Sequence, residues 1–260
     1  MVNIQSRVVN VKGINTHYYE CGQGEPLIIV HGGSAGASSW KNNIEVLSMN
    51  YHVYAPDLPG FGLTSIDLDS YAVPEVAEFV NQFSIAAGLK SFNLIGHSFG
   101  GGIAAHLALK YPSKVRKLVL VSSLCLGKEI AWWVRMFSSR PVCQIVGKVV
   151  ITLFKGIKFA AKVLANVVIE QPIKTASLEI GSSISNYTQQ KNVLLAQLPD
   201  LLVPTLVVWG GNDPIVPMEH AYAAGTLIPD CRVKVFTDCG HSVYREKFGE
   251  FSSVLAGFLG

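Results

Sequence analysis

The chain has 260 residues, of which 49% are apolar and 15% charged, and a formal net charge of +3. This composition excludes a disordered chain, and the low share of charged residues predicts one large domain with an extensive interior. The net charge is too small, and the basic residues are too scattered, for a nucleic-acid-binding surface, so no nucleic-acid partner is expected.

The cysteines and the first residues both bear on the cellular compartment. Five cysteines, irregularly spaced and without a C-x-x-C pair, argue against a disulfide framework or a zinc site. Residues 1–20 lack the basic flank, apolar core and cleavage site of a signal peptide. The sequence therefore predicts a reducing, cytoplasmic location.

The first predicted elements are two short antiparallel strands, 8–11 and 14–20, joined by a turn at Lys12-Gly13. Short apolar runs follow, too short for helices and without alternation, at 27–30, 53–55, 92–95, 118–121 and 206–209. A further strand is expected at 233–236. Runs of this kind predict a parallel sheet that is covered on both faces.

Helix-forming segments separate these strands. The clearest covers 74–87, where Pro74 stands in the first turn and Gly88 follows the end. Alternating strands and helices predict an α/β fold with right-handed crossovers and a mostly parallel, doubly wound sheet. Functional residues of such a fold lie at the C-terminal ends of the strands, directly after each apolar run.

The alternation stops between residues 124 and 199. This segment has nine basic and three acidic side chains, a net charge of +6, and its apolar stretches are spaced by lysines. We therefore predict a core domain of residues 1–123 and 200–260 with a helical cap inserted at 124–199. The preferred interpretation of the basic cap is a solvated helix face. The alternative is a binding surface that rests on an anionic membrane or steers an anionic substrate, and the sequence does not choose between these two roles.

Large side chains at the start of the cap are candidates for its own core or for the lining of a substrate pocket. They are Trp132, Trp133, Met136 and Phe137. Their size would suit an apolar acyl or alcohol group.

The strongest motif is Gly96-His97-Ser98-Phe99-Gly100, which follows the run 92–95 and precedes a helix-forming segment. A G-x-S-x-G turn between strand and helix holds the serine in a strained conformation at the top of the sheet. The small residues 96 and 100 allow neighbouring backbone to approach closely. Ser98 is therefore the predicted nucleophile.

A serine hydroxyl needs an imidazole to take its proton and a carboxylate to orient that imidazole. Asp213 directly follows the run 206–209, and His241 follows the strand expected at 233–236. Asp238 is the alternative carboxylate, but three positions before His241 it is badly placed to reach Nδ1. The predicted triad is Ser98, Asp213 and His241.

Two backbone N–H groups are candidates for an oxyanion hole. The loop 31–36 is glycine-rich and follows the run 27–30, so its Gly33 N–H can turn towards the nucleophile. The second donor is the N–H of Phe99, the residue after the nucleophile. No metal and no organic cofactor are expected, because neither a ligand-spaced carboxylate–histidine cluster nor a phosphate-binding glycine loop is present.

From residue 8 to the C-terminus the chain resembles the α/β-hydrolases. The resemblance rests on the elbow at Ser98 and on the motifs His31-Gly32-Gly33, Asp57-Leu58-Pro59-Gly60-Phe61-Gly62, Gly211-Asn212-Asp213 and Gly240-His241. It implies an α/β-hydrolase fold, the triad roles given above and a cap over the active-site mouth. Members that cleave epoxides or haloalkanes carry aspartate at the elbow, so the serine points to acyl transfer.

Three functions stay open, and the first is hydrolysis of a carboxylic ester of a small to medium apolar substrate. The second is carbon–carbon hydrolysis, because loop 31–37 with Trp40 and Asn42 is similar to that of meta-cleavage-product hydrolases; Arg135 or Arg140 would then hold a dienoate carboxylate. Those enzymes commonly carry Asn where this chain has His97, which is widespread among carboxylesterases and lipases. The third is non-catalytic binding of a small molecule. The acyl group, the alcohol group and the oligomeric state are not determined by the sequence.

Overall fold

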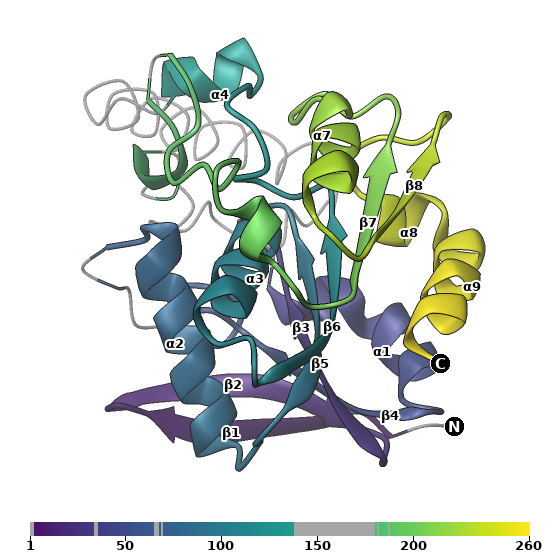
Figure 1. Ribbon diagram of the computed structural model, residues 1–260. Helices are drawn as coiled ribbons and strands as arrows, with labels where there is room; N and C mark the ends of the chain where they lie inside the picture. The colour runs from purple at the N-terminus through teal and green to yellow at the C-terminus, as the bar shows by residue number, and fades with distance from the viewer. Residues whose placement is uncertain are drawn as a thin grey trace, which may run out of the picture.

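The computed structural model describes residues 3–33, 36–64, 68, 70–137, 180, 182–186 and 188–260 (Figure 1). Most of the inserted segment predicted at 124–199 lies outside these ranges. The division into core and cap therefore stays a prediction.

An eight-stranded sheet with the order β1-β2-β4-β3-β5-β6-β7-β8 forms the centre of the molecule. Its strands are β1 Gln5–Val11, β2 Ile14–Cys21, β3 Glu25–Val30, β4 Tyr51–Pro56, β5 Phe92–His97, β6 Val115–Val121, β7 Thr205–Gly210 and β8 Cys231–Phe236. The pairs β1–β2 and β2–β4 are antiparallel, and every other pair is parallel. The predicted α/β fold with an antiparallel start is thus confirmed.

The central strands are buried on both faces of the sheet. In β3, Ile28 and Val30 pack into one apolar core, whereas Leu27 and Ile29 pack into a second core on the opposite face. Successive side chains of a strand point to opposite faces, so a strand covered on both sides needs an unbroken apolar run. This explains why the parallel strands were visible in the sequence.

Helices cover both faces, as Figure 1 shows. Helices α2 (Val73–Ala86), α3 (Phe99–Lys110) and α7 (Glu219–Leu227) pack into the first core. Helices α1 (Lys41–Leu47), α8 (Val243–Glu246) and α9 (Phe248–Leu259) pack into the second. Short 3-10 helices occupy Ala37–Trp40 and Leu198–Asp200.

The predicted helix 74–87 corresponds to α2, with Pro74 in its first turn. Gly88 follows with a φ of +74°, a left-handed conformation that glycine adopts without strain. From the predicted cap the structure describes helix α4, Trp132–Phe137, which lies above the C-terminal ends of the strands in Figure 1.

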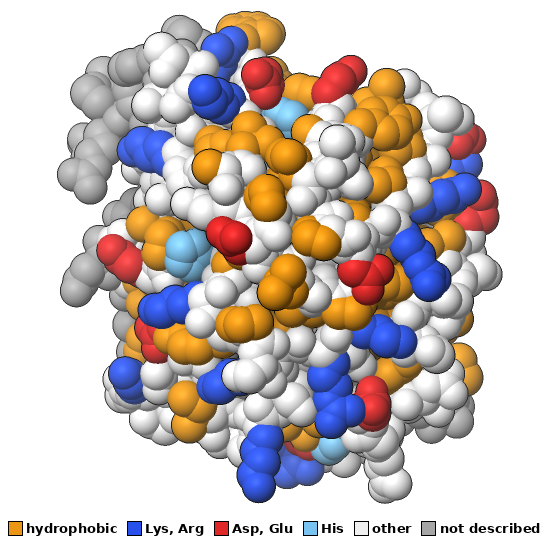
Figure 2. Space-filling view, in the orientation of Figure 1, with side chains coloured by type: hydrophobic (Ala, Val, Ile, Leu, Met, Phe, Trp, Pro, Cys, Tyr) orange, Lys and Arg blue, Asp and Glu red, His pale blue; other side chains and the backbone are white. Residues whose placement is uncertain are grey.

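Two findings concern possible partners. None of the helices in the described ranges is long and apolar enough to cross a membrane. Acidic and basic side chains are interspersed over the face shown in Figure 2. Cytoplasmic location and the absence of a nucleic-acid partner stay predictions, and contact of the basic cap with a membrane surface stays one of the alternatives left open by the sequence.

Candidate active site

Ser98 stands at a sharp turn between β5 and α3. Its φ of 53° and ψ of −116° lie outside the regions that residues with a side chain ordinarily adopt. The carbonyl oxygen of Ser98 accepts hydrogen bonds from the N–H groups of Gly101 at 2.9 Å and Leu124 at 3.0 Å, and its own N–H donates to Val121 at 2.9 Å. These bonds hold the turn in its strained conformation.

The glycines on either side of Ser98 are required by close backbone approach. A Cβ atom on Gly96 would lie 2.2 Å from the carbonyl oxygen of Gly100, and one on Gly100 would lie 2.3 Å from that of Val30. Both contacts are with backbone, which cannot rotate away as a side chain would. The turn therefore tolerates only glycine at these two positions.

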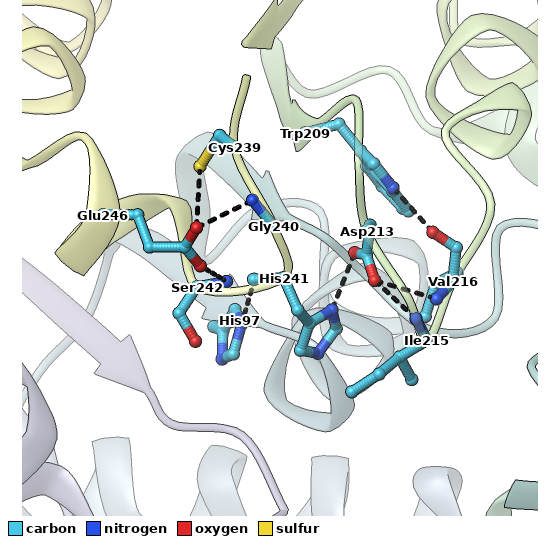
Figure 3. Close-up of polar contacts among 10 residues, drawn as sticks. All are labelled: His97, Trp209, Asp213, Ile215, Val216, Cys239, Gly240, His241, Ser242 and Glu246. Atoms are coloured by element: carbon cyan, nitrogen blue, oxygen red, sulfur yellow. Dashed lines mark hydrogen bonds and ion pairs between the residues drawn. The ribbon is translucent and has the colours of Figure 1, made fainter. Parts of the chain in front are cut away.

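Asp213 and His241 come together at the ends of β7 and β8. The Nδ1 atom of His241 and the Oδ2 atom of Asp213 are 2.7 Å apart (Figure 3). The other oxygen of Asp213 accepts the N–H groups of Ile215 at 2.8 Å and Val216 at 3.0 Å. The carboxylate is thus fixed from both sides and directed at the imidazole.

The Asp213 carboxylate is fully buried, and it is stabilised in its ionised form. Burial alone would raise its pKa, but the hydrogen bonds from His241, Val216 and Ile215 outweigh that effect and leave the pKa below its usual value. An ionised carboxylate can stabilise positive charge on the neighbouring imidazole. Asp213 therefore has the environment that an orienting carboxylate needs.

The backbone around His241 is held by two other side chains (Figure 3). Glu246 accepts the N–H of Gly240 at 2.8 Å with one oxygen and the N–H of Ser242 at 3.0 Å with the other. The Nε2 atom of His97 donates to the carbonyl oxygen of His241 at 3.0 Å. Three consecutive residues of the loop are fixed in this way, a contribution the sequence did not reveal.

His97 is neutral in this arrangement. Burial, and next the proximity of His241, lower the pKa of His97 to about 3. Because Nε2 carries the proton that is donated to the His241 carbonyl, Nδ1 is an unprotonated acceptor, and it has no hydrogen-bond partner within the described part of the chain. His97 thus supports the loop without adding charge beside it.

The alternative carboxylate, Asp238, is engaged elsewhere. Its side chain is 73% exposed and pairs with Lys247, with 2.6 Å between Oδ2 and Nζ. The carboxylate in contact with the imidazole of His241 is that of Asp213.

Ser98 and His241 line one pocket of about 280 Å³, although no hydrogen bond joins them within the described residues. Hydrogen bonds between a nucleophile and its base are often long in structures without substrate. The rest of the lining is largely apolar and includes Leu124, Ile130, Trp133, Val134, Ile180, Ile184 and Ile215. We refer to this space as the apolar pocket.

The two expected oxyanion donors, Gly33 and Phe99, also line the apolar pocket. His31 fixes the first of them, because its Nδ1–H donates to the carbonyl of Gly32 at 2.8 Å and its Nε2 accepts the N–H of Leu58 at 3.0 Å. In a trans peptide the C=O and the following N–H point in opposite directions, so the Gly33 N–H points away from His31. The Phe99 N–H begins α3 and has no partner within that helix.

The aromatic residues expected at the pocket divide between two environments. Trp133 lines the apolar pocket, whereas Trp132 is 69% exposed and is not part of the lining. The side chains of Met136 and Phe137 lie outside the described residues. Of the two arginines considered for carboxylate binding, Arg140 also lies outside them, and Arg135 donates from Nη1 to the carbonyl of Thr188 at 3.1 Å.

No group of three or more His, Cys, Asp or Glu side chains within the described ranges is placed to hold a metal ion. The expectation of a site without metal or cofactor stays a prediction.

Comparisons with known proteins place the chain in a family. The family model of the alpha/beta hydrolase fold matches residues 25–141 and 164–248. The chain is 31% identical to the dihydrolipoyllysine-residue acetyltransferase component of the acetoin cleaving system of Cupriavidus necator, covering 96% of this chain and 68% of that protein. It is 28% identical to the 2-hydroxy-6-oxo-6-phenylhexa-2,4-dienoate hydrolase of Burkholderia cepacia, covering 96% and 94%.

Among solved structures, a thermophilic esterase from Thermogutta terrifontis has a TM-score of 0.74 at 23% identity, covering 98% of both chains. This likeness concerns the fold. Since the family model spans most of the chain, the protein belongs to the alpha/beta hydrolase fold family.

Proposed function

We propose that the protein is a serine hydrolase that cleaves a carboxylic ester of a small to medium apolar substrate through an acyl-enzyme on Ser98. One observation carries this proposal. Ser98, in its strained turn, and His241 line the same pocket, and Nδ1 of His241 is hydrogen-bonded to the buried carboxylate of Asp213. A nucleophile, a base and an orienting acid are the parts that acyl transfer requires.

In the first half-reaction the Ser98 oxygen attacks the substrate carbonyl carbon while His241 takes the hydroxyl proton. Nδ1 of His241 is bound to Asp213, so Nε2 is the nitrogen that accepts the proton. The tetrahedral intermediate then collapses, the bond to the alcohol oxygen breaks, and His241 gives the proton to the leaving alcohol. The product of this half-reaction is an ester between the acyl group and Ser98.

In the second half-reaction a water molecule loses a proton to His241 and attacks the acyl carbon. The resulting intermediate collapses, the bond to the Ser98 oxygen breaks and the acid leaves, and His241 returns the proton to Ser98. In both steps the oxyanion would accept hydrogen bonds from the N–H groups of Gly33 and Phe99. The loss of one such donor costs about 3 kcal/mol in the transition state.

The apolar lining supports an apolar acyl or alcohol group, and a volume of about 280 Å³ supports a substrate of modest size. Carbon–carbon hydrolysis is the second candidate, favoured by the similarity to the dienoate hydrolase of Burkholderia cepacia. His97 before the nucleophile favours the ester, and we therefore place ester hydrolysis first.

Burst kinetics with p-nitrophenyl esters of graded chain length test the proposal. We expect a burst of p-nitrophenol equal to the enzyme concentration, absent from Ser98→Ala. Turnover that persists in the purified variant would remove Ser98 from the mechanism. Turnover of a dienoate substrate but of no ester would establish the second candidate, and tight binding of a small molecule without turnover would indicate a binding protein.

A further inference from the structure

A second pocket, which we call the polar pocket, adjoins the apolar one. Its volume is about 400 Å³, and it lies between the start of α1 and helix α8. Its lining consists almost wholly of polar or charged residues: Ser38, Ser39, Lys41, Asn42, Asn43, Tyr244, Arg245 and Phe248. The proposed chemistry at Ser98 does not use this space.

The charge in the polar pocket has one sign. Lys41 and Arg245 line it, and no Asp or Glu belongs to the described lining of either pocket. Neither cation forms an ion pair within the described residues; the Nζ atom of Lys41 lies 5.0 Å from the centre of the Tyr19 ring. The neighbouring carboxylate, Glu246, is already bonded to backbone N–H groups. Two uncompensated cations in a concave site attract an anion.

The two pockets meet at Tyr244 and Arg245, which line both. Tyr244 is held in place, since its ring stacks on that of Trp40 with centroids 4.0 Å apart and its carbonyl accepts the side-chain amide of Asn43 at 3.2 Å. Arg245 follows it in α8, the helix that begins two residues after His241. A molecule with its carbonyl at Ser98 can therefore extend along the apolar pocket to Arg245, which also lines the polar pocket.

We propose that the polar pocket binds a carboxylate carried by the substrate, with Arg245 as the principal partner and Lys41 as the second. The planar guanidinium offers paired N–H donors that match the two oxygens of a carboxylate. The inference rests on the proposed function and adds to it an ionised carboxylate on the ester, separated from the apolar group that lies at Ser98. It places the recognition of that group beside α1 and α8, on residues outside the segment 124–199.

Two pairs of esters test this assignment, one for each side of the scissile bond. The first compares p-nitrophenyl hydrogen adipate with neutral p-nitrophenyl hexanoate; the second compares para-acetoxybenzoate with its methyl ester. For each protein we take the ratio of kcat/KM for the anionic ester to kcat/KM for the neutral ester. This ratio cancels differences in overall activity between the wild type and its variants. We expect a ratio above one in at least one pair, and a fall of about fivefold in that ratio for Arg245→Gln, mainly through KM.

Lys247→Gln is the matched control, because Lys247 lies two residues after Arg245 but pairs with Asp238 and lines neither pocket. It should leave the ratio unchanged. A wild-type ratio of one or less in both pairs would overturn the assignment. So would an equal effect of Arg245→Gln on both members of a pair whose wild-type ratio exceeds one. Dependence of neutral-ester turnover on Ser98 tests the proposed function separately.

A binding measurement covers the case in which no ester is turned over. Free adipate should raise the Tm of Ser98→Ala, relative to sodium chloride at equal ionic strength, and not that of Ser98→Ala with Arg245→Gln. Absence of an Arg245-dependent shift would overturn the site. An adipate shift without any preference among the esters would identify a site for a separate anion and overturn the assignment to the substrate.

Discussion

The nucleophile turn and the histidine loop are fixed by different physical means. Around Ser98 the backbone is held by close packing, with glycines at positions where a Cβ atom would meet carbonyl oxygens at 2.2 and 2.3 Å. Around His241 the backbone is held by hydrogen bonds from the side chains of Glu246 and His97. One region depends on the absence of side chains, and the other on the presence of particular ones.

This difference predicts how each region responds to change. Added volume at the turn cannot be accommodated, because the opposing atoms belong to backbone and not to side chains that could rotate away. The loss of one hydrogen bond in the histidine loop should leave the fold intact. Its main effect should be a less well fixed position of the His241 imidazole. Substitutions in the first region should therefore affect folding, and those in the second should affect kcat and the response to pH.

The largest effect is expected from Ser98→Ala, which removes the proposed nucleophile while keeping the turn. We expect kcat for an accepted ester to fall by about four orders of magnitude or more, with unchanged thermal stability. Steady-state assays and thermal melts on the same preparation measure both. A clear fall in Tm beside the fall in kcat would mean that the substitution had disturbed the turn as well as the chemistry.

Gly100→Ala should break the nucleophile turn itself. The new methyl group would overlap the carbonyl oxygens of Val30 and His31, and we expect a loss of roughly 3 kcal/mol in the free energy of unfolding. Gly249→Ala in α9 is the control, since a Cβ atom there meets nothing within 4 Å. Denaturant melts of the control should show equal or slightly higher stability.

The same contrast explains which parts could be predicted from the sequence. The parallel strands and the elbow were visible because full burial demands apolar runs and close approach demands glycine, and both requirements are local. Helices α1, α8 and α9 and the contact of Glu246 with the histidine loop were not predicted. Glu246 acts only because the chain turns back into α8 after His241, and no local pattern marks that return.

His97→Asn should alter the acid stability of the histidine loop. The pKa of His97 is about 3 in the folded state, against 6.5 for an unperturbed histidine, so the unfolded chain binds the proton more readily. Stability is therefore complete above about pH 6.5 and falls as the pH drops towards 3. Between about pH 7 and pH 4.5 we expect the wild type to lose about 2 to 3 kcal/mol more than the variant.

Denaturant melts of both proteins at both pH values measure this difference directly. The contributions of the other titrating groups to the pH dependence cancel, because both proteins share those groups. An equal loss of stability in the two proteins would show that His97 is protonated in the folded state at about pH 4.5. Protonation of His97, with Nε2 still donating to the His241 carbonyl, would then not lower the free energy of unfolding at acid pH.

The smallest effect is expected from Glu246→Gln, which keeps one acceptor oxygen and loses the charge. One of the two backbone N–H groups beside His241 then loses its acceptor, and the imidazole is held less firmly. We expect kcat to fall by about tenfold with little change in KM, because substrate contacts persist while the proton acceptor is displaced. Glu250→Gln in α9 is the matched control, since that carboxylate lies 3.8 Å from Lys247 and forms no hydrogen bond with the loop backbone in the described part of the chain.

The pH dependence separates this positioning role from a general loss of stability. Hydrogen bonds from Gly240, and then from Ser242, hold the pKa of Glu246 below its ordinary value of 4.5, so its ionised form stabilises the folded state above that pH. The contribution is lost as the pH falls through the lowered pKa. The stability of the wild type should thus converge on that of Glu246→Gln in acid, while the kcat difference persists near neutral pH. If the stabilities of the wild type and Glu246→Gln instead differed by the same amount down to acid pH, the ionised carboxylate of Glu246 would not be what supports the backbone at His241.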